Sequence, residues 1–169
     1  MSENKEEAIK AAQILEVSFR DNLKFRDGFF QNNEYHQLEV IKKIRQYRPE
    51  IVLCNAVDDR HIDHGVASKL VSDACFLSGL MKVETCVDDS NEIQQPWRPK
   101  TLYHYIQWKI LQPDFVVDIS LFIDKKTASV FAYSSQFYYP NSNEPDSPIT
   151  SENFLDSVKY RAQDLGRLV

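Results

Sequence analysis

The chain has 169 residues, of which 43% are hydrophobic and 27% charged, so it can bury a core and is not a disordered chain. Its formal net charge is −5 and no segment gathers lysines and arginines, which argues against nucleic acid or an anionic membrane surface as a partner. No apolar run approaches the roughly 18 residues of a membrane-spanning helix, and the N-terminus lacks the apolar segment of a signal peptide. These properties predict a globular protein that does not bind membranes.

The cysteines and glycines narrow the possible classes of protein further. The three cysteines, Cys54, Cys75 and Cys86, form an odd set without a Cys-x-x-Cys pair. This predicts a reduced, cytoplasmic protein without disulfides, with Cys54 and Cys75 as core thiols. The two Gly-rich phosphate-loop patterns, GxGxxG and GxxxxGK[ST], do not occur, which excludes the simple nucleotide-binding classes.

The hydrophobic pattern predicts helices and strands in an order typical of an α/β protein. Helices are expected over 2–15, 34–47, about 65–78, 124–133 and 151–165, the last capped by Ser151. Strands are expected over 51–56, 101–108 and 115–119, with a strand or loop at 19–27, an irregular stretch at 86–100 and a Pro-rich surface loop at 139–148. The run at 51–56 is interpreted as a continuous apolar strand, typical of a parallel strand buried on both faces, and 115–119 is expected to be another buried strand. We therefore expect a single α/β domain over residues 1–169.

A dense polar cluster follows the strand expected over 51–56. The segment 57–64 reads VDDRHIDH and leads into the next helix. Ligands bind at the carboxyl ends of strands in open α/β sheets, imidazole is a good zinc ligand or acid–base group, and a carboxylate can orient a neighbouring imidazole. His61, Asp63 and His64 are therefore candidate catalytic or metal-binding residues. An alternative stays open from the spacing alone: the aspartates cap the helix and the histidines are solvated.

Several collinear motifs resemble one known family. They are IVLCNA at 51–56, DRHIDHG at 59–65 and ACFLSGL at 74–80, with further matches at 27–32, 97–100, 103–107, 113–119 and 133–138. Over essentially the whole chain they look like the PIG-L/LmbE superfamily of zinc-dependent de-N-acetylases, and most of all like the bacillithiol biosynthesis deacetylases. The resemblance implies a Rossmann-like, three-layer α/β fold with an open, mainly parallel sheet. It also implies a zinc-dependent amide hydrolase that removes acetyl from N-acetylglucosaminyl malate or a similar N-acetylglucosaminide.

The resemblance also assigns roles to residues of the polar segment. The motif His-Pro-Asp-His of the family corresponds to residues 61–64, with Ile62 in place of the proline. By this correspondence His64 is a zinc ligand, His61 assists at the tetrahedral intermediate and Asp63 orients an imidazole.

Three further residues are candidates for binding substrate. A guanidinium can hold a carboxylate by two hydrogen bonds, so Arg60 is a candidate for the malate group. Tyr105 and Gln107, on the strand expected over 101–108, are candidates to face the substrate. The alternatives are an exposed loop arginine and an ordinary packed aromatic strand.

One departure from the family concerns its opening motif. Relatives begin with a strand and His-Pro-Asp-Asp, which supplies two zinc ligands and the general base, whereas the remaining histidines here, His36 and His104, fall in an expected helix and strand. We therefore expect a domain truncated at its N-terminal strand or strands and at its C-terminus, with only His64 of the three ligands typical of catalytic zinc.

This truncation leaves two functions open. The chain is part of the hydrolase itself and is expected to be unable to run the reaction alone, or it is a non-catalytic remnant or partner subunit of a split deacetylase. Loss of a central strand further predicts an exposed apolar surface beside 51–56, and hence a homo-oligomer.

Overall fold

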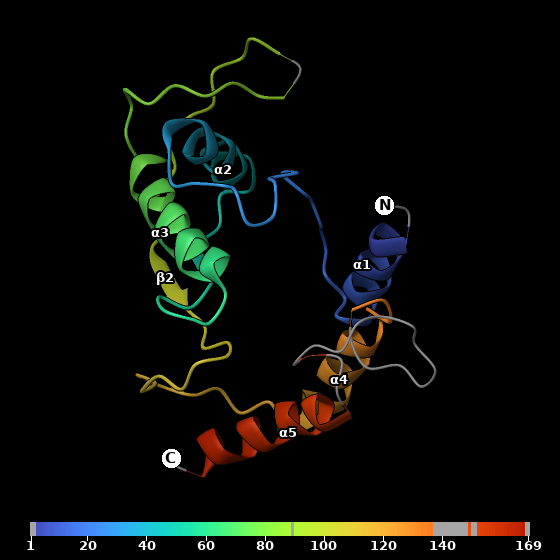
Figure 1. Cartoon of the computed structure of the whole chain (residues 1–169). Coiled ribbons are helices and arrows are strands. Elements are labelled where there is room, and N and C mark those ends of the chain that lie inside the picture. The colour runs from blue at the N-terminus through green and yellow to red at the C-terminus, as the bar shows by residue number, and fades with distance from the viewer. Residues whose placement is uncertain (1–2, 89, 137–148, 150–151, 168–169) are drawn as a thin grey trace. The chain divides into compact units, whose positions relative to one another are not determined.

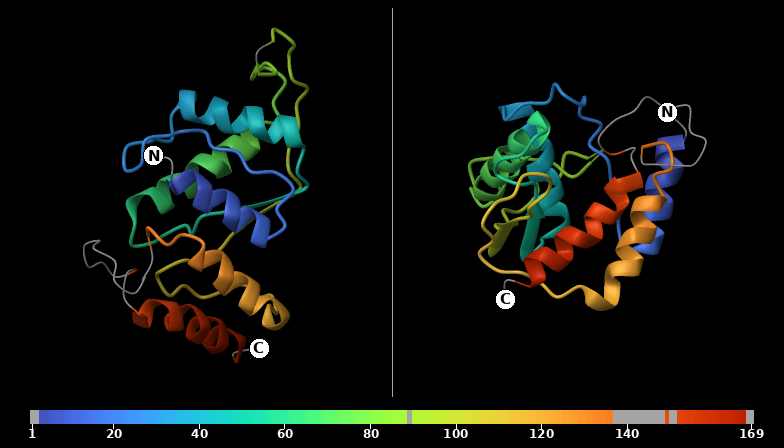
Figure 2. Two further views of the ribbon diagram at one scale, coloured as in Figure 1. Left: turned by 90° about the vertical axis from the view of Figure 1, so that its right-hand side faces the viewer. Right: turned by 60° about the horizontal axis from the view of Figure 1, so that its bottom comes forward.

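A computed structural model describes residues 3–88, 90–136, 149 and 152–167 (Figures 1 and 2). Its contacts divide the chain into two compact units, one made of Met1–Asp21 and Asp114–Val169 and the other of Asn22–Pro113. The single domain expected over 1–169 stays a prediction. Within the described part of the chain, no helix has the length and apolar character needed to cross a membrane.

The unit Asn22–Pro113 begins with the helix α2 (Glu34–Tyr47), which has the bounds predicted from the sequence. The side chain of Asn33 accepts a hydrogen bond from the backbone N–H of His36 and so caps the first turn. The helix stops at Arg48, whose backbone takes the left-handed conformation, and the following Pro49 cannot continue it.

A small parallel sheet and a crossover helix complete this unit. The strand β1 (Ile51–Cys54) pairs in parallel with β2 (Thr101–His104), so that Ile51 lies opposite Thr101 and Cys54 opposite His104. The helix α3 (Ile62–Leu77) lies between them in the sequence. This arrangement confirms a mixed α/β fold with parallel pairing, although both strands are shorter than predicted.

Within the described residues of this unit, helices cover one face of the sheet. In Figures 1 and 2, α2 and α3 lie side by side, and their buried residues form a core against Val52 of β1 and Leu102 of β2. Alternate side chains of a strand point to opposite faces, and Ile51 and Leu53 on the other face are 58% and 66% exposed. The prediction of a strand buried on both faces is therefore wrong, and the predicted exposed apolar surface beside this strand is confirmed. The core residues that are themselves buried are Ile41, Ile44, Ala74 and Cys75.

The other unit is helical. It contains α1 (Glu3–Ile14), a short 3-10 helix η1 (Ser120–Phe122), α4 (Ile123–Phe131) and α5 (Glu152–Gly166), and α4 contacts both α1 and α5. The buried carboxylate of Glu7 on α1 accepts hydrogen bonds from the Ser134 hydroxyl and from the backbone N–H and hydroxyl of Ser135. These bonds fix the chain beyond α4 to α1.

The predicted strand at 115–119 is wrong. The segment has no regular secondary structure, and Phe115 and Val117 are 55% and 69% exposed. An apolar run forms a strand only where a neighbouring strand takes up its backbone hydrogen bonds, and no strand of the described residues pairs with this one. The surface loop expected at 139–148 and the Ser151 cap lie outside the described residues.

Candidate active site

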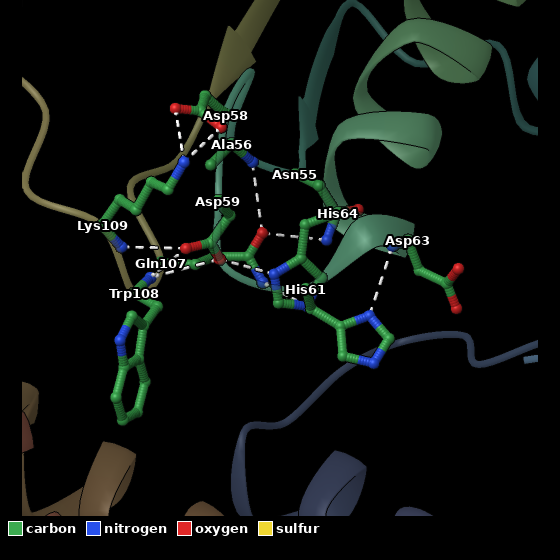
Figure 3. Close-up of polar contacts among 10 residues, drawn as sticks. All are labelled: Asn55, Ala56, Asp58, Asp59, His61, Asp63, His64, Gln107, Trp108 and Lys109. Atoms are coloured by element: carbon green, nitrogen blue, oxygen red, sulfur yellow. Dashed lines mark hydrogen bonds and ion pairs between the residues drawn. The ribbon is translucent and has the colours of Figure 1, made fainter. Parts of the chain in front are cut away.

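Two polar segments meet at one edge of the sheet. Residues 55–61 follow β1 and residues 105–109 follow β2, and because the strands are parallel, both segments leave the sheet at its carboxyl end. Figure 3 shows their side chains pointing toward one another beside the first turn of α3. This is the edge at which open α/β sheets bind ligands.

The two histidines of the motif occupy the start of α3. His61 is the residue before the helix, and its Nδ1 accepts a hydrogen bond from the backbone N–H of Asp63 at 3.3 Å. This cap explains why α3 begins at Ile62 rather than near residue 65, as the sequence predicted. The ring of His64, one turn along, lies 5.3 Å from that of His61 between centroids. His61 is exposed, whereas the His64 side chain is 31% exposed.

The imidazole of His64 is held from both sides. Its Nδ1 lies 2.5 Å from Oδ2 of Asp59, and its Nε2 lies 3.2 Å from the amide nitrogen of Gln107 (Figure 3). The Gln107 oxygen in turn accepts hydrogen bonds from the side-chain nitrogen of Asn55 at 3.0 Å and the backbone N–H of Ala56 at 3.2 Å. Side chains from three segments thus form one hydrogen-bonded chain.

Asp59 is the most buried acidic group of the site. Its side chain has no exposed surface, and its carboxylate also accepts hydrogen bonds from the backbone N–H groups of Trp108 and Lys109. Burial raises the pKa of Asp59, but hydrogen bonds from Lys109, His64, Arg60 and Trp108 outweigh it and hold the pKa well below its usual range. The family resemblance had implied Asp63 as the carboxylate that orients an imidazole.

The other expected site residues have different contacts. The carboxylate of Asp63 is buried and accepts a hydrogen bond from the backbone N–H of Gly28 at 2.7 Å. The guanidinium of Arg60 lies 4.8 Å from the centroid of the Trp108 ring. Tyr105 is 45% exposed, and its backbone N–H donates to the carbonyl of Cys54 just beyond the sheet. The substrate and catalytic roles given to these residues stay predictions.

The site contains one imidazole nitrogen, Nε2 of His64, of the kind that zinc takes as a ligand. A catalytic zinc ion typically takes three protein ligands and a water. Among the residues that the structure describes, no group of three or more His, Cys, Asp and Glu side chains is placed to hold a metal ion. His64 has a nitrogen suited to zinc, and the described residues do not complete the site around it.

The fold and the site define an α/β protein with paired histidines and a buried carboxylate at the carboxyl edge of a parallel sheet. A family model described as PIG-L, GlcNAc-PI de-N-acetylase, matches residues 2–75. The crystal structure of the conserved protein TT1542 from Thermus thermophilus is 30% identical, with a TM-score of 0.83 over 99% of this chain and 68% of that one. The chain belongs to the PIG-L family. The matched region includes β1, the polar segment and most of α3.

Proposed function

We propose that this protein is a de-N-acetylase-type hydrolase whose reacting groups lie at the carboxyl edge of β1 and β2. The observation that carries the proposal is the pair of neighbouring imidazoles at the start of α3, within the region that matches the PIG-L family. Hydrolysis of an acetamide requires a group that takes a proton from water and a group that stabilises the oxyanion of the tetrahedral intermediate. The two rings offer the second capacity, through His61, and an imidazole nitrogen on His64 that would hold the zinc ion.

His61 is the donor of the pair. The backbone N–H of Asp63 donates a hydrogen bond to Nδ1 of His61. A backbone N–H can only donate, so this Nδ1 carries no proton when the ring is neutral. The proton then lies on Nε2 of an exposed ring, from which it can be donated to a developing oxyanion. This agrees with the role at the intermediate that the family resemblance implies.

His64 is the hydrogen-bond acceptor of the pair. Its Nδ1 faces the carboxylate of Asp59, so Nδ1 carries the proton and Nε2 has the lone pair. That lone pair accepts a hydrogen bond from Gln107, which must give it up when another group binds there. When bound, zinc polarises an amide carbonyl and acidifies a water molecule. His64 would hold it through Nε2, with further ligands from outside the described set.

The substrate part of the proposal is N-acetylglucosaminyl malate, as in bacillithiol biosynthesis, or a similar N-acetylglucosaminide. It is supported by the motifs that resemble this subfamily and by Arg60, whose exposed guanidinium beside Trp108 is available to a carboxylate. A Rossmann-like, layered sheet, a cytoplasmic location and a homo-oligomer belong to the same proposal. The three cysteines are free and the outer face of β1 is apolar, which supports the last two.

Acetate release from N-acetylglucosaminyl malate tests the function. Residues 1–169 and the longest reading frame that contains them are purified, their zinc is measured by elemental analysis, and each is assayed. We expect acetate release from the form that holds stoichiometric zinc, and a loss of at least about 100-fold in His64→Ala. Zinc-loaded protein that releases no acetate from any N-acetylglucosaminide contradicts the proposal.

The variant His61→Ala distinguishes the role of His61 from that of His64. We expect it to keep its zinc and to lose kcat, because His61 acts on the intermediate and not on the metal. Lys69→Gln is the control, since Lys69 is an exposed residue of α3 whose amine pairs with Asp73 away from the site. Equal activity in His61→Ala and Lys69→Gln contradicts the role given to His61.

A further inference from the structure

The buried carboxylate of Asp59 is not explained by the roles given to the two histidines. It lies in the surface segment between β1 and α3, yet its side chain has no exposed area. Removing a carboxylate from water costs free energy unless hydrogen bonds replace the lost solvation. The partners of Asp59 therefore indicate what its burial holds in place.

These partners come from two separate segments of the unit. Oδ1 accepts the backbone N–H groups of Trp108 at 3.1 Å and Lys109 at 2.8 Å, and Oδ2 accepts Nδ1–H of His64 at 2.5 Å (Figure 3). Asp59 thus connects the segment after β2 to the imidazole at the start of α3. The residue just before these N–H groups is Gln107, the other partner of that imidazole.

The hydrogen bonds of Gln107 independently indicate which nitrogen of His64 carries the proton. The backbone N–H of Ala56 can only donate, so the Gln107 atom that faces it must be the oxygen, and the amide nitrogen then faces His64. An amide nitrogen also only donates, so Nε2 of His64 accepts. In the neutral ring the proton is therefore on Nδ1, which is where the carboxylate of Asp59 accepts it.

We propose that Asp59 is the positioning residue of this site: it selects the Nδ1–H tautomer of His64 and fixes the ring, so that the Nε2 lone pair is available to the reaction. The use made of that lone pair rests on the proposed function. The tautomer is a property of the folded chain and can be measured without substrate or metal.

The variant Asp59→Asn tests this directly. Its amide oxygen can still accept the N–H groups of Trp108 and Lys109, but its amide nitrogen turns a donor toward Nδ1 of His64. We expect the Nδ1–H tautomer to dominate in the unaltered protein and to become the minor form in the variant. Nitrogen-15 NMR of labelled histidine reports the tautomer at a pH where the rings are neutral, and His64→Gln identifies the signals.

Asp58→Asn is the matched control. The neighbouring carboxylate has a 61% exposed side chain and pairs with the amine of Lys109 at 2.7 Å, so the same chemical change there should leave the His64 signals unchanged. An Nε2–H tautomer in the unaltered protein overturns the proposal, and so does an Nδ1–H tautomer that survives in Asp59→Asn. The tautomer of the unaltered protein tests the proposal even where the Asp59→Asn variant does not fold.

Activity gives a second readout in the form of the enzyme that releases acetate. Loss of a group that orients a reacting histidine typically costs about 10- to 100-fold, and we expect this in kcat with KM changed less than about threefold. Unchanged kcat in a folded Asp59→Asn overturns the positioning role. Complete absence of acetate release in the unaltered protein counts against the proposed function instead, and the tautomer measurement still decides the role of Asp59.

Discussion

The carboxylate of Asp63 accepts a hydrogen bond from the backbone N–H of Gly28, with 2.7 Å between the two atoms. This contact ties the turn before α2 to the first turn of α3, next to His64. Gly28 has a φ of +73°, in the left-handed region that disfavours residues with a Cβ. The position of that turn thus depends on a backbone conformation that glycine adopts without strain.

Replacement of Gly28 by alanine should lower the free energy of unfolding by about 1 kcal/mol. The added Cβ meets no atom within 4 Å, so the cost comes from the left-handed backbone and not from a clash. Denaturant unfolding followed by circular dichroism measures it. Gly65→Ala is the control, because Gly65 lies within α3 and its Cβ would make only an ordinary 3.8 Å contact with the carbonyl of Val57. Equal stability in the two variants would contradict the argument.

Arg45→Lys should destabilise the unit Asn22–Pro113 by about 2 kcal/mol. The guanidinium is buried and donates from three nitrogens, to the carbonyls of Ser78 and Leu80 and the hydroxyl of Thr85. A lysine has one nitrogen and cannot replace all three hydrogen bonds, so buried hydrogen bonds of the guanidinium are lost, although the backbone N–H groups of Trp97 and Val83 still reach the two carbonyls.

The control for Arg45 is Arg26→Lys, since Arg26 is exposed and rests on the Phe29 ring at 4.0 Å. It should change stability by less than about 0.5 kcal/mol. Thermal or denaturant unfolding of both variants measures the difference. An Arg45→Lys protein as stable as Arg26→Lys would show that the three hydrogen bonds contribute little.

Stability should depend on acid pH through Glu7. Burial raises the pKa of Glu7, but hydrogen bonds from Ser135 and then Ser134 outweigh it, so that the pKa lies below its ordinary value. A lowered carboxyl pKa means that the ionised form stabilises the folded state above the unfolded pKa near 4.3, and that this contribution is lost as the pH falls further. The Tm deficit of Glu7→Gln should therefore be present at pH 7 and shrink below about pH 4.

The exposed neighbour Glu6 provides the control for this pH series. Glu6→Gln should leave Tm close to that of the unaltered protein across the same range, because an exposed carboxylate contributes little to stability. A Tm deficit of Glu7→Gln that is independent of pH would indicate loss of packing and not loss of an ionised carboxylate.

The three thiols should react at very different rates. Cys86 is exposed, whereas burial raises the pKa of Cys54 and of Cys75 to about 11. The thiolate is the reactive form, so a disulfide reagent at pH 8 should modify one thiol quickly and the other two only after unfolding. Mass spectrometry of the native and the denatured protein counts the modified sites, and Cys86→Ser should abolish the fast phase.

The sequence predicted much of the unit Asn22–Pro113. The apolar spacing of α2 and the following Pro49 predicted the bounds of the helix, and the apolar run at 51–56 predicted the parallel strand whose residues 51–54 form β1. The prediction was wrong where a local pattern needs a partner: the run 115–119 begins with three apolar residues, but no strand of the described residues pairs with it. Periodicity reports propensity, whereas a strand also requires another backbone beside it.

The candidate site shows the same difference between local sequence signals and contacts that depend on the fold. The motif identified His61 and His64, because a polar run at the end of a predicted strand is a local signal. The contact of Asp59 with His64 spans five residues, but its contacts with Trp108 and Lys109 depend on the pairing of β1 with β2. The nearness of Asp59 to the motif, five residues before His64, was the one signal available, and it gave no reason to prefer Asp59 over Asp58.

The register of the small sheet sets a rule about insertions and deletions. Cys54 lies opposite His104, so the two segments start level with each other, and Gln107 reaches His64 only because it is the third residue after His104. An added or deleted residue between His104 and Gln107 would move the Gln107 amide away from the His64 imidazole. A changed side chain at Tyr105 or Ile106 would leave the number of residues between His104 and Gln107 unchanged. Sequence variation here should therefore be found in residue identity and not in segment length.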